Sequence, residues 1–148
     1  MSYGLVWFKR DLRWRDHAAL AQASSNKPVR CIYIIEPELL LGPDYALQHF
    51  EFIRESLLEL DSHLRARGGC IEIHTGQATD VFKRLWHESP FSELYSHEET
   101  GNGFTYARDL QVASWCQANN VTWREFAQFG VVRGLKNRNL WQRAWERH

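Results

Sequence analysis

LVWFKRDLRWRDHAAL, residues 5–20, leads from an apolar, strand-like run into a cluster of charges and then into the start of a helix. Residues 4–8, GLVWF, predict a strand. Residues 16–24, DHAALAQAS, predict a short helix with Asp16 as its N-cap. The fold therefore follows from how far this strand–helix order extends along the chain.

The same order continues to residue 126. Further strands are predicted at 29–35, 70–74, 92–97 and 121–126, and further helices at 44–67, 78–88 and 104–119. The helix at 44–67 is the clearest, because one face is apolar and Gly68–Gly69 follow it. That face carries Phe50, Ile53, Leu57, Leu60 and Leu64. The alternation predicts an α/β fold, a Rossmann-like doubly wound sheet of five parallel strands in three α/β/α layers.

The composition is that of one globular domain: 148 residues, 44% hydrophobic and 24% charged. The formal net charge is zero, which argues against binding nucleic acid through bulk electrostatics alone. Basic residues still gather at the two ends, within residues 1–16 and 133–148. No signal peptide or membrane span is expected from the sequence, and its three cysteines lack CxxC spacing. A cytoplasmic protein without a membrane partner is therefore predicted.

In a doubly wound sheet, ligands bind outside the carboxyl ends of the strands, near the switch in strand order. Those ends are predicted to be Lys9–Arg10–Asp11, Glu36, Gly76 and His97–Glu98–Glu99. Charges of both signs that converge there would orient a small polar ligand. The alternative is that these are ordinary polar loops whose charges pair with each other.

Motifs for other chemistries are missing from the sequence. No GxGxxG or GxxxxGK[ST] follows the first strand, and GNG at 101–103 lacks the required spacing, so it predicts an entry turn to the next helix. The seven histidines never pair at HxxxH or HxH spacing, and no metal site is expected. No GxSxG elbow supplies a nucleophile.

The segment VWFKRDLRWRDHAAL resembles the N-terminal signature of the DNA photolyase/cryptochrome family, a strand ending in W-F-(basic)-x-D-L-R before a helix start. Further segments keep the order and spacing of that family: CIYIIEPELL, HFEFIRESLLELDSHLRARGG, LYSHEETGNGFTYARD and GVVRGLKNRNLWQRAWERH. The resemblance implies that residues 1–130 form the N-terminal α/β domain. Residues 131–148 would begin the connector to a missing helical FAD-binding domain.

The resemblance implies a function as the light-harvesting domain of a FAD-dependent deoxyribodipyrimidine photolyase, a carbon–carbon lyase that repairs pyrimidine dimers by light-driven electron transfer. In the family, the helical domain binds FAD and UV-damaged DNA, so this chain alone is expected to hold no catalytic residue. The alternatives are the same domain of a cryptochrome blue-light photoreceptor, a stand-alone small-ligand-binding module, and a structural partner domain. Trp141 and Trp145, four residues apart on a basic helix-like tail, favour a two-domain protein.

In this family the N-terminal domain can hold an antenna chromophore of folate, deazaflavin, flavin or lumazine type. Folate-binding members carry an Asn-Glu pair where this chain has Phe104 and Thr105, and deazaflavin or flavin binders often carry an Arg where it has His49. The type of chromophore is therefore left open. The residues predicted to bind it are Lys9, Arg10, Asp11, Glu36, His49, His97 and Glu98.

Overall fold

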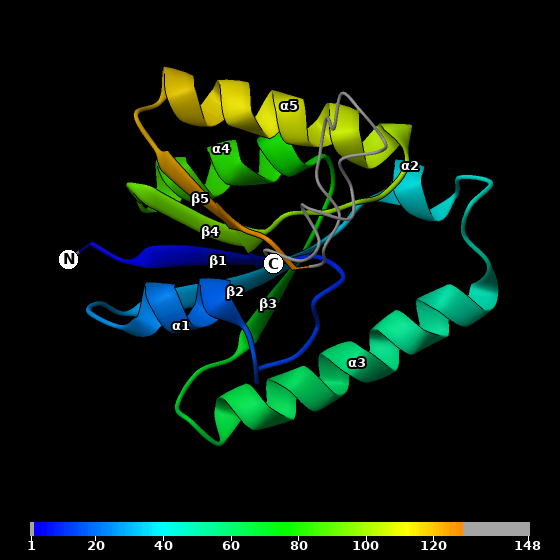
Figure 1. The fold of residues 1–148 in the computed structure, drawn as a ribbon, viewed down its shortest axis with the longest axis horizontal. Helices are drawn as coiled ribbons and strands as arrows, with labels where there is room; N and C mark the ends of the chain where they lie inside the picture. The colour runs from blue at the N-terminus through cyan, green and yellow to red at the C-terminus, as the bar shows by residue number, and fades with distance from the viewer. Residues whose placement is uncertain (1, 129–148) are drawn as a thin grey trace, which may run out of the picture.

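The strands form one parallel sheet in the order β3-β2-β1-β4-β5 (Figure 1). The computed structural model describes residues 2–128. Its strands are β1 (Gly4–Phe8), β2 (Val29–Ile35), β3 (Ile71–Thr75), β4 (Glu93–His97) and β5 (Thr122–Phe126). The chain starts in the middle strand, builds outward through β2 and β3, and then adds β4 and β5 on the other side. The switch in strand order therefore lies between β1 and β4, and the predicted α/β class is confirmed.

Helices cover both faces of the sheet, as Figure 1 shows. The helices are α1 (Ala18–Ser24), α2 (Pro37–Leu40), α3 (Leu47–Arg65), α4 (Ala78–Glu88) and α5 (Gly103–Ala118). α1 and α3 lie on one face and α4 and α5 on the other, while the short α2 follows β2 directly. The result is the predicted three-layer arrangement.

Alternate residues of β1 build the two cores. Trp7 packs edge-to-face on Phe82 of α4, with ring centroids 5.1 Å apart, and Trp115 of α5 stacks on Phe82 in turn. Phe8 points the other way, into the cluster that holds Leu60 of α3. Every residue of β1 is buried, as expected for the central strand of a sheet covered on both faces.

Most predicted boundaries agree with the structure to within one residue; the exceptions are the start of the first helix, at Ala18 rather than residue 16, and both ends of the long helix. It begins at Leu47 rather than at residue 44, because residues 42–45 form a hydrogen-bonded turn and Ala46 takes the N-cap position. The helix ends close to the predicted stop, where Gly68 adopts a φ of +81° that favours glycine. The short helix α2, just before this turn, was not predicted.

Asp16 is not the N-cap of α1, contrary to the sequence prediction. It has a φ of +47°, and its backbone carbonyl accepts hydrogen bonds from the Arg13 side chain. The cap is His17, whose Nδ1 accepts the backbone N–H of Leu20 at 3.0 Å. His17 takes this position because its ring is held from the other side by a buried carboxylate, described below.

Two predictions concern other parts of the chain. Trp141, Trp145 and the connector predicted at 131–148 lie outside the described residues. Within residues 2–128, none of the helices is long and apolar enough to cross a membrane. The described part thus comprises the sheet, its five helices and the loops at their ends.

Candidate functional site

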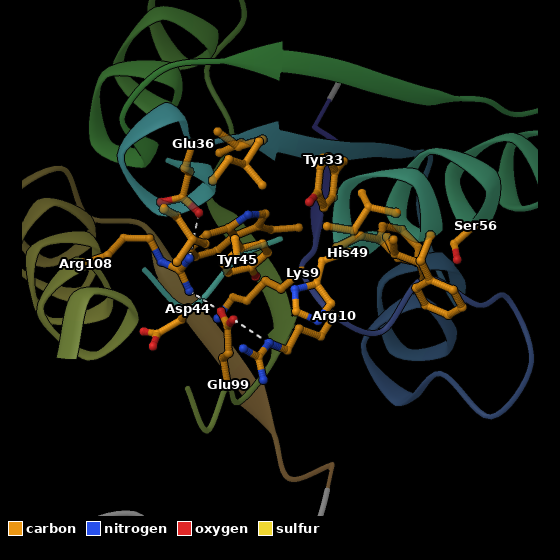
Figure 2. A pocket seen from close by; sticks show the side chains of 18 of the residues that line it. Lys9, Arg10, Tyr33, Glu36, Asp44, Tyr45, His49, Ser56, Glu99 and Arg108 are labelled. Atoms are coloured by element: carbon orange, nitrogen blue, oxygen red, sulfur yellow. Dashed lines mark hydrogen bonds and ion pairs between the residues drawn. The ribbon is translucent and has the colours of Figure 1, made fainter. Parts of the chain in front are cut away.

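A cavity of about 550 Å³ opens at the carboxyl edge of the sheet (Figure 2). Lys9, Arg10 and Glu36 line it from the ends of β1 and β2, and α3 contributes His49 and Ile53. The volume is within the range of small-molecule sites, about 300–1,000 Å³. A cavity large enough for a small molecule therefore lies at the edge where the strand topology predicts a ligand site.

Arg108 of α5 organises the charged end of this cavity. Its guanidinium donates to Glu36 Oε1 at 2.6 Å and to Glu99, and it lies 4.8 Å from the centroid of the Trp7 ring. Burial lowers the pKa of Arg108, but the carboxylates of Glu99, Glu36 and Asp109 more than offset this and raise it above its usual value. Glu36 follows β2 and Glu99 follows β4, so this one side chain connects both sides of the switch point.

Lys9 is buried beside this network. Its Nζ donates to the backbone carbonyl of His97 at 3.2 Å, lies 3.6 Å from Asp109 Oδ2 and sits 4.2 Å from the centroid of the Trp7 ring. Burial lowers the pKa of Lys9, and the neighbouring Asp109 carboxylate partly opposes that effect. Lys9 is thus a fixed part of the cavity floor.

Arg10 and Glu36 differ sharply in their exposure to solvent. The Arg10 side chain is 53% exposed at the mouth of the cavity, with its Nε 3.4 Å from Glu99 Oε1. Glu36 is buried, which raises the pKa of its carboxyl group. Its Oε2 has no hydrogen-bond partner among residues 2–128. Arg10 is therefore the cation best placed to meet an incoming ligand, while Glu36 belongs to the buried base of the site.

Aromatic and aliphatic side chains line the other half of the cavity. Tyr33 of β2 turns its hydroxyl toward the cavity (Figure 2). Tyr45 packs edge-on against His49, with ring centroids 5.7 Å apart. His49 Nδ1 accepts the backbone N–H of Ala46, so the proton of a neutral imidazole is on Nε2. This half can hold a flat ring and offers it a few hydrogen-bonding groups.

Asp11 is the centre of a separate buried cluster with His17 and His97. Its carboxylate accepts the backbone N–H of Lys9 at 2.7 Å, and its Oδ2 lies 2.6 Å from His17 Nε2 and 2.7 Å from His97 Nδ1. Burial would raise the pKa of Asp11, but hydrogen bonds from both imidazoles hold it far below its usual value. The cluster ties the loop after β1 to α1 and to the end of β4.

The same three side chains offer one carboxylate and two imidazoles within 4.8 Å of one another, a set that could in principle ligate a metal. His17 Nδ1 is already the acceptor that caps α1, so the proton of a neutral imidazole is on Nε2, which lies 2.6 Å from Asp11 Oδ2. A metal ligand needs a lone pair at that position instead. The observed geometry is therefore that of a hydrogen-bonded cluster that shapes the loop.

The structure divides the seven predicted cofactor-binding residues into two groups. Lys9, Arg10, Glu36 and His49 line the large cavity. Asp11, His97 and Glu98 instead surround a hollow of about 10 Å³, which is too small for a chromophore. The sequence prediction omitted Tyr33, Tyr45, Glu99 and Arg108 as site residues. The Arg-Asp pair at 108–109 and the strand-end position of Glu99 were the signals that could have identified two of them.

Comparisons with known proteins agree with this fold. The DNA photolyase family model matches residues 4–133. Cryptochrome-2 of Gallus gallus is 37% identical over 107 residues, which cover 72% of this chain and 18% of that protein. Cryptochrome-1 of Mus musculus is 30% identical over the same length, again 72% and 18% of the two chains. The chain thus spans less than a fifth of the length of these relatives.

Solved structures show the same fold. A photolyase of Sulfolobus tokodaii, described as having two FAD molecules, has a TM-score of 0.81 and 24% identity, covering 98% of this chain and 35% of that one. A class III photolyase of Agrobacterium tumefaciens has a TM-score of 0.79 and 24% identity, covering 93% and 28%. Together with the family match, these findings show that the chain belongs to the DNA photolyase family and contains its N-terminal α/β domain.

Proposed function

We propose that this chain is the light-harvesting domain of a FAD-dependent deoxyribodipyrimidine photolyase, which repairs UV-induced pyrimidine dimers by light-driven electron transfer. The observation that carries the proposal is the 550 Å³ cavity at the carboxyl edge of the sheet, in a domain of this family. One half has aromatic and aliphatic walls and the other has charged groups. Such a site suits a planar conjugated ligand with polar substituents, as an antenna chromophore is.

Four of the residues that the sequence predicts as ligands have distinct roles in this proposal. Arg10 meets the polar edge of the chromophore at the cavity mouth, and His49 donates a hydrogen bond from Nε2. Glu36 and Lys9 form the buried base, held by Arg108 and by the Trp7 ring. Asp11 and His97 act indirectly, because they position the loop that carries Lys9 and Arg10.

FAD and UV-damaged DNA are assigned to a helical domain that follows residues 131–148. Support comes from the relatives, of which this chain covers only 18%, and from the solved photolyases, of which it covers 28–35%. In this proposal, electron transfer and dimer cleavage take place in that domain, and residues 1–130 supply excitation energy. A cytoplasmic location belongs to the same proposal, and two buried free thiols, Cys31 and Cys116, are consistent with a reducing compartment.

A second function, that of a cryptochrome photoreceptor, is favoured by a specific observation. Cryptochromes of Gallus gallus and Mus musculus are among the relatives that match this chain, at 37% and 30% identity. A repair assay separates the two functions. The native protein, purified from its source, is mixed with UV-irradiated oligothymidylate under blue light. Dimer splitting supports the photolyase, and intact dimers with a light-responsive flavin support the cryptochrome.

The antenna site itself is tested by titrating the chain with FMN, a deazaflavin, a folate and a lumazine, each followed by its own fluorescence. We expect one of these classes to bind, and Arg10→Glu to weaken its binding at least tenfold. Arg124→Glu is the matched control, because that side chain is 50% exposed and lies 3.3 Å from a single carboxylate, Glu93, away from the cavity. Failure of all four classes to bind, or equal effects of the two variants, would contradict the proposal.

A further inference from the structure

Three exposed arginines, which we call the basic strip, gather around Trp14 in the loop between β1 and α1. Arg13 and Arg15 flank Trp14 in the sequence, and Arg67 follows the end of α3. The loop passes that end of α3 (Figure 1), where the Trp14 ring lies 5.4 Å from the ring of His63, measured between centroids. Arg13 also lines the cavity described above. The basic strip therefore begins at the cavity wall.

The charges of the basic strip are held in place by neutral groups. The Arg67 guanidinium lies 3.6 Å from the centroid of the Trp14 ring and donates from Nη1 to a backbone carbonyl of α3 at 2.8 Å. The Arg15 guanidinium lies 4.6 Å from the Trp14 centroid. Arg13 donates from Nε and Nη2 to the backbone carbonyl of Asp16, at 3.3 and 3.0 Å. Each guanidinium is thus oriented, while N–H donors remain for another partner.

Arg13, Arg15 and Arg67 form no ion pair with a carboxylate within residues 2–128. Asp16 lies in the same loop, but it contacts Arg13 through its carbonyl. Like charges that gather without a counter-charge repel one another, and an anion bound beside them offsets that repulsion. Other arginines of the described part do pair with a carboxylate: Arg10, Arg30, Arg54, Arg65, Arg108 and Arg124.

The length of the basic strip indicates the kind of anion that fits it. Ser56 is the last residue of α3 that lines the cavity, and Arg67 lies roughly 15 Å beyond it along the helix. A single phosphate on a ligand in the cavity reaches only Arg13. A tail with several charged groups extends to Arg15 and Arg67.

We propose that the ligand of the cavity carries an anionic tail, a phosphate ester or a chain of carboxylates, which leaves the cavity past Arg13 and binds at Arg15 and Arg67. This inference rests on the proposed function, because it takes the cavity as the site of the chromophore ring. It narrows the expected chromophores to their charged forms. Phosphorylated flavins or deazaflavins and polyglutamyl folates have such a tail, whereas an uncharged lumazine does not.

The tail is tested with matched pairs of ligands, titrated into the 148-residue chain by calorimetry. The pairs are riboflavin and FMN, a deazaflavin with and without its 5′-phosphate, and folate with one or three glutamates. An exposed ion pair strengthens binding by up to about fivefold, so the more highly charged member of the pair that binds should gain about fivefold or more. The gain should disappear as the salt concentration rises from about 0.01 M to 1 M.

Variants of the basic strip assign the gain to particular side chains. Arg13→Ala should remove the preference for a single phosphate, and Arg15→Ala combined with Arg67→Ala the preference for three glutamates. Arg67→Lys keeps the positive charge and should keep most of the gain, which separates charge from packing. Arg84→Ala is the matched control, because this exposed arginine bonds to His74 from α4, on the opposite face of the sheet. It should leave every ratio unchanged.

Inorganic tripolyphosphate tests the basic strip without a ring. We expect it to bind, and Arg15→Ala combined with Arg67→Ala to weaken its binding at least about fivefold. Binding that the double variant leaves unchanged overturns the proposal, as does a chain that binds only the uncharged lumazine. A DNA duplex bound through Arg15 and Arg67, with no gain from any tail, also overturns it, because the strip would then be a nucleic-acid surface.

The tail and the antenna function fail separately. If a ring binds in a way that depends on Arg10 and its tail adds nothing, the tail alone is refuted. If tripolyphosphate binds at the basic strip while no chromophore class binds with or without a tail, the proposed antenna function is refuted. The strip is then an anion site independent of the cavity.

Discussion

Replacing the buried carboxylate at the end of β1, Asp11→Asn, is expected to destabilise the fold by about 3 kcal/mol. Three donors converge on this group: Lys9 N–H, His17 Nε2 and His97 Nδ1, at 2.6–2.7 Å. Both imidazoles place a nitrogen within 2.7 Å of the same oxygen, Oδ2. An amide has one oxygen and one NH₂ group, so in either orientation its NH₂ faces at least one N–H donor.

The expected loss of unfolding free energy is estimated from the hydrogen bonds that Asp11→Asn removes. Hydrogen bonds to a charged group contribute about 1.5–3 kcal/mol each, and removing one partner of a buried charged pair costs about 3–5 kcal/mol. Asn keeps the volume of Asp and one acceptor, so we place its cost at the lower end of that range. The measurement is the free energy of unfolding from urea titration at about pH 7. Asp80→Asn, on the exposed first turn of α4, is the control and should cost less than about 1 kcal/mol.

The same carboxylate predicts how stability depends on pH. The pKa of Asp11 is held below its usual value in the folded protein, so the unfolded chain binds a proton at this group more readily than the folded one. The stabilisation is therefore present above the unfolded pKa, about 3.9, and is lost as the pH falls below it. A loss of less than about 1 kcal/mol in Asp11→Asn, or an equal acid sensitivity of the variant and the natural protein, would refute this account.

Two further predictions concern the backbone and the thiols. Gly68→Ala should cost about 1 kcal/mol of unfolding free energy, because φ is +81° there, whereas Gly103→Ala, at the first position of α5 with open space around it, should cost nothing. Of the three cysteines, Cys70 is exposed, while burial raises the pKa of Cys31 and Cys116 to about 12. One thiol per folded chain should therefore react quickly with a disulfide reagent near neutral pH, and two fast thiols would contradict the described burial.

The fold could be predicted from the sequence because each strand is a short apolar run and each helix has its own periodicity. β1 and β2 agree with the predicted strands to the residue, since their β-branched and aromatic runs end at charges. The start of α3 could not be predicted in the same way. The sequence before it contains Asp44, which instead accepts a hydrogen bond from Asn102, 58 residues along the chain. Local helix propensities give no information about a contact between residues so far apart in the sequence.

From the sequence, only those site residues that lie at the ends of predicted strands could be identified. The carboxyl ends of parallel strands meet at one edge, which is why Lys9, Arg10 and Glu36 lie together. The spacing of residues in a loop does not predict the direction in which each side chain points. Asp11, for example, points inward to two histidines instead of toward the cavity. Tyr33 was missed because a continuously apolar strand does not indicate which of its side chains faces a cavity.

The position of the cavity depends on which side chains occupy the switch point between β1 and β4. In an open α/β sheet, the crevice between the diverging strands normally receives the ligand. Here Arg108 and Lys9 occupy that place over the Trp7 ring, joined to carboxylates that follow β2 and β4. The free space is therefore displaced toward the α3 side, where Tyr33 and His49 replace charged groups as the walls. In the proposed function, this charge-paired base beside an aromatic wall is what would hold a conjugated ligand in a fixed orientation.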